Sequence, residues 1–382
     1  ISTSYGSGYV FSAPVLSLSQ AADGGGKSTL SPPSLLALEY YHEARVASRH
    51  LDPLQLERSR ALLQRSLQDT PAFSEAALYL VSLHLDRCRW GLVDSLSVGA
   101  EVETLLHHVE QHHAPSEHLH ALRAESSSLL HWQPAMVQHT YGSWLPQELS
   151  FGLPLLSWVR HLLACGQAEE GMELLGPKLD TCLPIGWYLA AQLLFQMGQA
   201  KAAMEMLTTQ LRIDRSIQAS QLFLAVLHAH MGDRSAALAS LDLCQLKDTS
   251  FHGFQAGIAY ALARVGEGSR AEPLLAKAAS VQDASLTMIS VWALAALAIG
   301  ERDLAGVLFQ RAVDQRCYQA PFLAQSPLLD VYGQEPCVQA FRERMAKAFE
   351  RPTRPVRKSP KGDTSASPPS SDGPQAEADP PS

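Results

Sequence analysis

The chain has 382 residues, of which 46% are hydrophobic and 18% are charged, and its formal net charge is −8 at pH 7. That apolar content is enough for a continuous core, and the negative charge excludes a surface that binds nucleic acid over most of its area. The six cysteines are scattered without a CxxC pair, which favours reduced thiols in a cytoplasmic protein over a disulfide framework.

The chain opens on a hairpin pattern. Residues 1–11 alternate in character on either side of Gly6-Ser7-Gly8, so we expect two short strands within residues 1–16. A lone hairpin is only marginally stable in water, and no later segment offers a sheet for it to join. Because Ile1 also stands where a native chain would begin with methionine, we expect an upstream domain to be missing. The alternative is a frayed N-terminal strand.

Residues 17–33 are rich in serine, glycine and proline and are expected to form a flexible linker. Residues 21–28 match a relaxed phosphate-loop pattern. A true phosphate loop needs a buried strand before it and a long helix after it, whereas Pro32-Pro33 follow closely here. We therefore favour a linker over a nucleotide site and expect no cofactor.

Residues 34–350 are expected to be helical, and they contain evenly spaced glycines separated by 32, 34, 34 and 34 residues. These glycines are Gly166, Gly198, Gly232, Gly266 and Gly300. A fixed period near 34 indicates stacked helix pairs, with each glycine at the tight turn inside a pair. The apolar stretch 286–299 is too short to span a bilayer and falls on the first helix of a repeat, so no membrane partner is expected.

Small residues keep the same register as the glycines and allow the two helices of a pair to approach closely. They lie seven residues before and five residues after four of the glycines: Ala191, Ala203, Ala225, Ala237, Ala259, Ala271, Ala293 and Ala305. Nine residues after each of those glycines comes a large apolar residue: Leu207, Leu241, Leu275 and Phe309. The pattern resembles the tetratricopeptide repeat. A looser copy precedes it, with Ser59, Leu63 and Ser66 on a second helix.

Two longer helices, 99–113 and 116–131, are expected to interrupt the regular spacing. Histidines gather there, and His108 and His112 are four residues apart on one predicted face. No HExxH motif and no cysteine joins them, so we favour a solvated polar face and predict no metal site. A metal or pH-sensing site within 107–139 remains the alternative.

The repeats suggest a binding groove for a protein or peptide. First-helix side chains should line its concave face, and the candidates are Tyr188, Gln192, Phe195, Leu222, Val226, His230, Tyr260 and Arg264. Each of them has the alternative of packing between helices. No catalytic motif falls on a suitable scaffold, so no enzymatic activity is expected.

Residues 351–382 are proline-rich and carry no aromatic residue, so we expect a disordered tail. The tail begins basic and ends acidic. Its basic start could add phosphate contacts, although a solvated tail is favoured.

Residues 3–11 resemble the closing hairpin, or wing, of the OmpR/PhoB-type winged-helix DNA-binding domain, which ends in a T-x-x-G-x-G-Y-x-F segment. A winged-helix domain followed by a linker and tetratricopeptide repeats is similar to the HilA-like branch of bacterial transcriptional regulators. The last predicted helix, 335–349, is similar to the close of such arrays.

This resemblance implies roles for the wing. Thr3 and Tyr9 match positions whose hydroxyl groups hydrogen-bond phosphates, and Gly6, Ser7 and Gly8 match the turn that approaches the DNA backbone. The recognition helix that reads the major groove would lie in the missing domain. The expected function is that of a transcriptional regulator that binds promoter DNA, with the array as a protein-interaction or self-association module. The alternative is a repeat adaptor or chaperone with no DNA role.

Overall fold

The computed structural model describes residues 2–4, 8–10, 32–48, 53–137, 152–181, 184–215, 217–244, 252–280 and 287–349. Strands β1 (Ser2–Ser4) and β2 (Gly8–Val10) pair antiparallel, with Thr3 opposite Tyr9. All the longer elements of the described ranges are helices. The predicted all-α fold with a short N-terminal hairpin is therefore confirmed.

The N-terminal region contains five helices. They are α1 (Leu35–Ala47), α2 (Pro53–Asp69), α3 (Ser74–Arg89), α4 (Ser95–His112) and α5 (Glu117–Glu125), which continues into the π-helical turn η2 (Ser126–Leu130). Helix α4 begins four residues before the predicted start, because the carboxylate of Asp94 caps it and accepts the backbone N–H of Ser97 at 2.9 Å.

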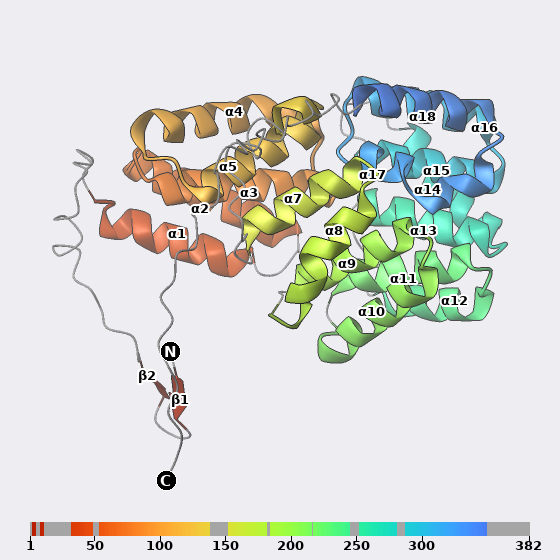
Figure 1. Cartoon of the computed structure of the whole chain (residues 1–382), viewed down its shortest axis with the longest axis horizontal. Coiled ribbons are helices and arrows are strands. Elements are labelled where there is room, and N and C mark those ends of the chain that lie inside the picture. Colours follow the sequence, from red (N-terminus) through yellow and green to blue (C-terminus); the bar gives the residue numbers. More distant parts are fainter. Residues whose placement is uncertain are drawn as a thin grey trace, which may run out of the picture. The chain divides into compact units, whose positions relative to one another are not determined.

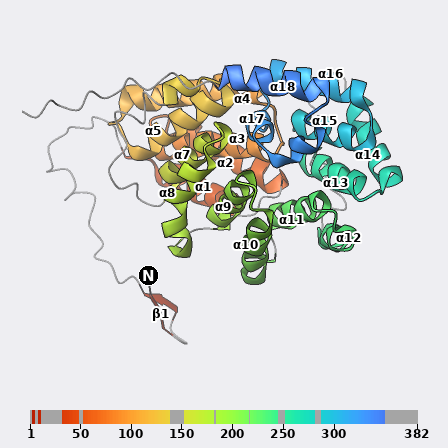
Figure 2. The same ribbon diagram turned by 45° about the vertical axis from the view of Figure 1, so that its right-hand side comes forward.

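Helix pairs follow in a curved row (Figures 1 and 2). The pairs are α7 (Leu153–Ala164) with α8 (Ala168–Leu175) and the 3-10 turn η3 (Gly176–Thr181), α9 (Pro184–Gln196) with α10 (Ala200–Ile213), α11 (Gln218–His230) with α12 (Arg234–Leu243), α13 (His252–Arg264) with α14 (Gly268–Ser280), and α15 (Ile289–Ile299) with α16 (Arg302–Asp314). The chain then forms α17 (Ala320–Ala324), η4 (Pro327–Tyr332) and α18 (Pro336–Ala348). The predicted tetratricopeptide-like repeat array is confirmed.

The five evenly spaced glycines all occupy the turn inside a helix pair. Their φ angles are 75°, 76°, 81°, 82° and 100°, a left-handed conformation that side chains other than glycine rarely adopt. The residue after each glycine donates its backbone N–H to the carbonyl five residues earlier, at 2.8–2.9 Å, as in Gln199 to Leu194. This bond closes the first helix with a Schellman motif and sets the direction of the second.

The predicted small positions lie where helices meet. All eight alanines are 0% exposed, which lets neighbouring helices pack at close range. The pair α7–α8 follows the same rule with glycine: a Cβ at Gly171 on α8 would come within 2.8 Å of a methyl group of Leu193 on α9.

The pair α1–α2 uses serine where the later pairs use alanine. Ser59 and Ser66 are fully buried on α2, and their hydroxyls donate to the carbonyls of Ala44 and Ala37 on α1, at 2.9 and 2.8 Å. A small polar side chain is tolerated there because its hydroxyl has a partner.

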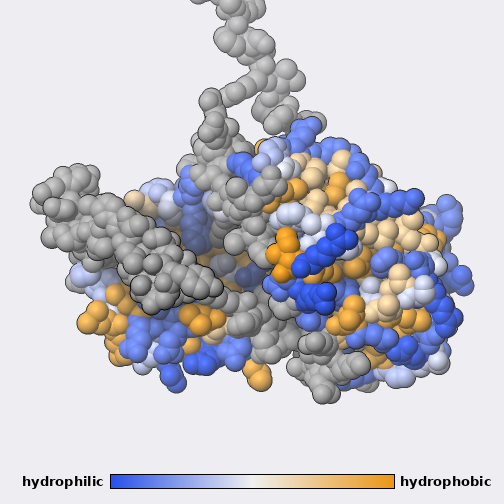
Figure 3. All heavy atoms as spheres, turned by 90° about the horizontal axis from the view of Figure 1, so that it is seen from below, coloured by the Kyte–Doolittle hydropathy of each residue, from blue (hydrophilic) through white to orange (hydrophobic). Residues whose placement is uncertain are grey.

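The surface carries apolar side chains between hydrophilic ones on the face shown in Figure 3. The two most exposed large examples lie on the first two helices, where Leu35 is 86% and Leu54 79% exposed, and Val46 on α1 is 60% exposed. No helix among the described residues is long and apolar enough to cross a membrane.

Candidate functional site

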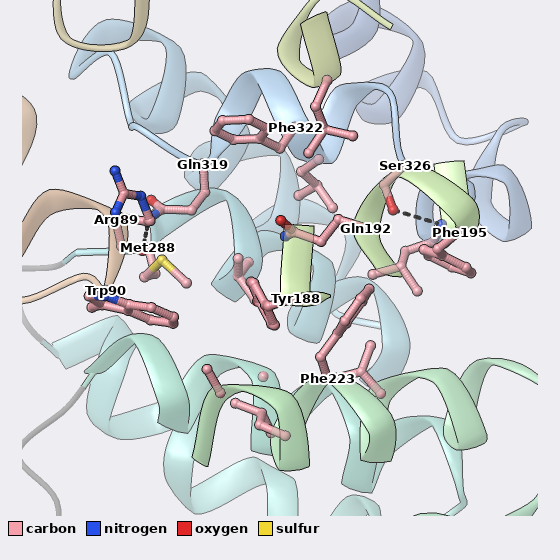
Figure 4. Close-up of a pocket in the computed structure, with 18 of the residues that line it drawn as sticks. Arg89, Trp90, Tyr188, Gln192, Phe195, Phe223, Met288, Gln319, Phe322 and Ser326 are labelled. Carbon is pink, nitrogen blue, oxygen red and sulfur yellow. Dashed lines mark hydrogen bonds between the residues drawn. The ribbon is translucent and has the colours of Figure 1, made fainter. Parts of the chain in front are cut away.

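The concave side of the repeat array encloses a cavity of about 230 Å³. The first helices of five successive pairs supply most of its wall: α7, α9, α11, α13 and α15. The turn that ends α3 and the segment around α17 supply the rest. Figure 4 shows side chains from these elements converging on one space.

Six of the eight predicted groove residues line this cavity. They are Tyr188, Gln192, Phe195, Leu222, Val226 and Tyr260. Gln192 projects toward the centre, between Tyr188 and Phe322 (Figure 4). The structure brings these six together, and their role in binding a partner stays a prediction.

The other two predicted residues, His230 and Arg264, do not line the cavity. The ring of His230 meets that of Phe195 edge to face, with the ring centroids 5.3 Å apart. Burial and the neighbouring Arg264 lower the pKa of His230, which favours the neutral imidazole. Burial also raises the pKa of Tyr260 and Tyr332, and Arg264 opposes both shifts. His230 and Arg264 therefore pack against residues of the cavity wall and are not part of its lining.

Aromatic rings form a continuous row along the cavity. Trp90 stacks on Phe254 with ring centroids 6.2 Å apart and lies 6.0 Å from Tyr188. Tyr188 meets Phe223 at 5.7 Å, and Phe223 meets Phe195 at 6.0 Å, both edge to face. Rings held in such contacts present a rigid apolar surface that loses little conformational entropy when a ligand binds.

Residues far apart in the sequence meet at the cavity wall. The amide of Gln319, just before α17, donates to the backbone carbonyls of Cys88 and Arg89 at 2.9 and 2.5 Å. The hydroxyl of Thr287 donates to the carbonyl of Gly91. These bonds join the N-terminal region to the end of the array, so that Arg89, Trp90 and Gln319 form one part of the wall.

A buried ion cluster supports one end of the cavity, around a carboxylate whose side chain is 0% exposed. Glu125 pairs with Arg89 through Oε1 at 2.5 Å and with Arg160 through Oε2 at 3.0 Å. It also accepts the hydroxyl of Tyr318 at 2.8 Å and that of Ser157. Burial alone would raise the pKa of Glu125, but the two guanidiniums outweigh it and lower the pKa to about 2.

Polar groups without partners also face the cavity. Within the described part of the chain, the hydroxyl of Tyr188 and the amide of Gln192 make no hydrogen bond, and both residues line the space. The buried Nε of Arg89 likewise has no acceptor. Burial raises the pKa of Tyr188 to about 12 against the opposing effect of Arg89, so the phenol keeps its proton and remains a donor.

Sequence reasoning missed the residues that close the site: Arg89, Trp90, Tyr318, Gln319 and Phe322. They lie outside the regular repeats, and the period of 34 says nothing about them. One local signal was available for Glu125, because it is a single acid between Ala124 and Leu129 on an otherwise apolar helix face.

Two histidines of helix α4 pair with backbone carbonyls of the chain. The rings of His108 and His112 lie 4.5 Å apart, and each ring pairs with a backbone carbonyl, of Pro71 and His108 respectively. In the ranges that the structure covers, no three His, Cys, Asp or Glu side chains are placed to hold a metal ion. His139 lies outside those ranges.

The wing candidates are described only in part. Thr3 and Tyr9 lie opposite one another and Gly8 lies opposite Ser4, whereas Gly6 and Ser7 lie outside the described residues. The phosphate-loop-like segment 21–28, most of the linker and the tail 351–382 lie outside them too.

Compared with protein-family models and with curated protein sequences, the chain matches none of them. The resemblance to HilA-like regulators therefore rests on the sequence pattern of residues 3–11 and on the repeats, and it stays a prediction.

Proposed function

We propose that this chain is part of a DNA-binding transcriptional regulator of the HilA-like type, with the repeat array as the module that receives a controlling partner. The single observation that carries the DNA-binding role is the N-terminal hairpin. Its antiparallel register pairs Thr3 with Tyr9 across Gly6-Ser7-Gly8, as expected if residues 3–11 are a wing. In that role the hairpin contacts the sugar-phosphate backbone of promoter DNA.

Two features support a protein contact for the array. Repeat arrays of stacked helix pairs offer long surfaces that suit protein partners. Helices α1 and α2 also expose the apolar side chains of Leu35, Val46 and Leu54, and exposed apolar surface is a feature of interaction sites. The partner is either another protein or a second copy of the chain.

Selection of random-sequence duplexes by the full-length protein tests this function. We expect enrichment of a defined sequence, and an affinity that falls steeply with salt because phosphate contacts release counterions. Substituting Thr3→Ala and Tyr9→Phe should weaken binding to all duplexes by a similar factor, since phosphate contacts carry no sequence information. Ser17→Ala in the linker is the matched control and should leave DNA affinity unchanged. Absence of DNA binding at every salt concentration would refute the proposal.

A repeat adaptor or chaperone with no DNA role is the second candidate, and the aromatic cavity favours it. Six first-helix side chains already converge there, as they would in a site built for a bound segment. The same selection separates the two candidates, because an adaptor enriches no duplex while it still co-purifies with a protein partner.

A further inference from the structure

The cavity is lined by hydrogen-bond donors that have no acceptor and by the buried Oε1 of Gln196, which has no donor. Tyr188 and Gln192 lie one helical turn apart on α9, line the cavity and have no partner among the described residues. Tyr188 keeps its proton, and the amide nitrogen of Gln192 carries two more hydrogens. A ligand oxygen at this place would satisfy both side chains at once.

The adjoining end is formed by ion pairs. Arg89 and Arg160 both line the cavity, with side chains 15% and 6% exposed, and both pair with the buried carboxylate of Glu125. Arg89 also pairs with Asp86, whose side chain is 34% exposed. The two guanidiniums are therefore matched by two carboxylates, but the buried Nε of Arg89 has no acceptor and remains a donor that a ligand oxygen would satisfy.

The remaining wall is apolar and aromatic, and the volume limits what it can hold. An engineered apolar cavity of about 150 Å³ binds benzene. The cavity here measures about 230 Å³, so it suits a body somewhat larger than one ring.

We propose that this cavity binds a small aromatic carboxylic acid, with the carboxylate toward Tyr188, Gln192 and the arginine end and the ring among Trp90, Phe223 and Phe254. Bound there, the carboxylate accepts hydrogen bonds from Tyr188, Gln192 and the unpaired Nε of Arg89. The ring continues the row of aromatic contacts. The inference goes beyond the proposed function and does not depend on DNA binding.

Calorimetric titration of the full chain with 3-phenylpropionate tests the proposal, with 3-phenylpropionamide as the neutral analogue of the same size and shape. Charge-assisted hydrogen bonds are worth enough for about a tenfold difference or more, so we expect the acid to bind at least that much more tightly than the amide. Equal binding of the two, preference for the amide, or no binding of either would overturn the proposal. This comparison uses the unaltered protein and does not depend on any variant folding.

Val291→Phe and its matched control Val307→Phe test whether the acid binds in this cavity. Val291 lines the cavity on α15, and Val291→Phe should abolish binding of the acid by filling the space. Val307 is 65% exposed on α16, and Val307→Phe should leave the affinity unchanged. Gln192→Leu should reduce the preference for acid over amide. Unchanged affinity in a folded Val291→Phe variant, checked by circular dichroism, would show that the acid binds elsewhere and would refute the site.

Discussion

The helix pairs α9–α16 and the N-terminal helices α3–α5 are held together by different kinds of contact. The repeats meet through alanine and leucine, and their turns rely on glycine. The N-terminal helices bury charged groups instead, including Glu125 at 2% exposure and Arg87 at 8%. The helix pairs α9–α16 are therefore held together by close packing of apolar side chains, whereas the helices α3–α5 also depend on buried ion pairs.

Removing the charge at Glu125 should have the largest effect on this contrast. Glu125→Gln leaves Arg160 buried without a counter-charge and Arg89 with Asp86 alone, so we expect the free energy of unfolding to fall by about 3–5 kcal/mol. Urea unfolding followed by circular dichroism measures it. Glu173→Gln, on an exposed residue of α8, is the control and should change stability by less than about 0.5 kcal/mol. A loss of similar size in both variants would show that the buried cluster contributes no special stability.

Low pH should weaken the same ion cluster around Glu125. The pKa of Glu125 is about 2 in the folded chain against an ordinary 4.5, so its stabilising effect is fully present above pH 4.5 and is lost as pH falls toward 2. A lowering of that size corresponds to about 3 kcal/mol. Urea unfolding at pH 6, 4 and 3 should show stability falling with pH.

The Glu125→Gln variant is the control for the acid prediction and should lose less stability over the same range. Some loss will remain, because the hydrogen bond from His131 and the charge of Arg123 outweigh burial and lower the pKa of Glu103 to about 2 as well. Identical pH profiles for the variant and the unaltered protein would contradict the assignment to Glu125.

Substituting a glycine in a repeat turn should lower the stability less than Glu125→Gln does, and it should do so through backbone strain. At Gly232 a Cβ would meet no atom within 4 Å, but φ is +81°, so Gly232→Ala should cost about 1–2 kcal/mol through backbone strain alone. Gly268 also has free space but begins helix α14 without a positive φ. Gly268→Ala should therefore stabilise the chain, by about 0.4–1 kcal/mol. Thermal denaturation compares the two, and a loss of stability in both would contradict the backbone explanation.

The repeats could be predicted because their physical requirements recur. A glycine in the left-handed turn, an alanine at the helix contact and a large residue between pairs are needed every 34 residues, so Gly232, Ala225 and Leu275 each have counterparts that support the interpretation. The inward direction of Tyr188 and Gln192 followed from the same register.

The closure of the cavity could not be predicted from that pattern. Gln319 finds its acceptors 231 and 230 residues away, and Tyr318 meets Glu125 at a separation of 193. Such contacts occur once, so no repeated signal supports them. They depend on how far the array curves, which is the sum of small rotations at every pair. His230 and Arg264 lie outside the cavity lining, and their part in a partner groove stays a prediction.

The hydrogen bonds from Gln319 to Cys88 and Arg89 can form only after residue 319 has been synthesised. Ribosomes add about 5–20 residues per second, so about 10–50 s pass between the emergence of Arg89 and that of Gln319. During that interval Trp90 and the charges around Glu125 lack the segment that later covers them. During this interval the nascent chain therefore exposes Trp90 and the charges around Glu125 to the cell, and the segment around Gln319 covers them once it has emerged.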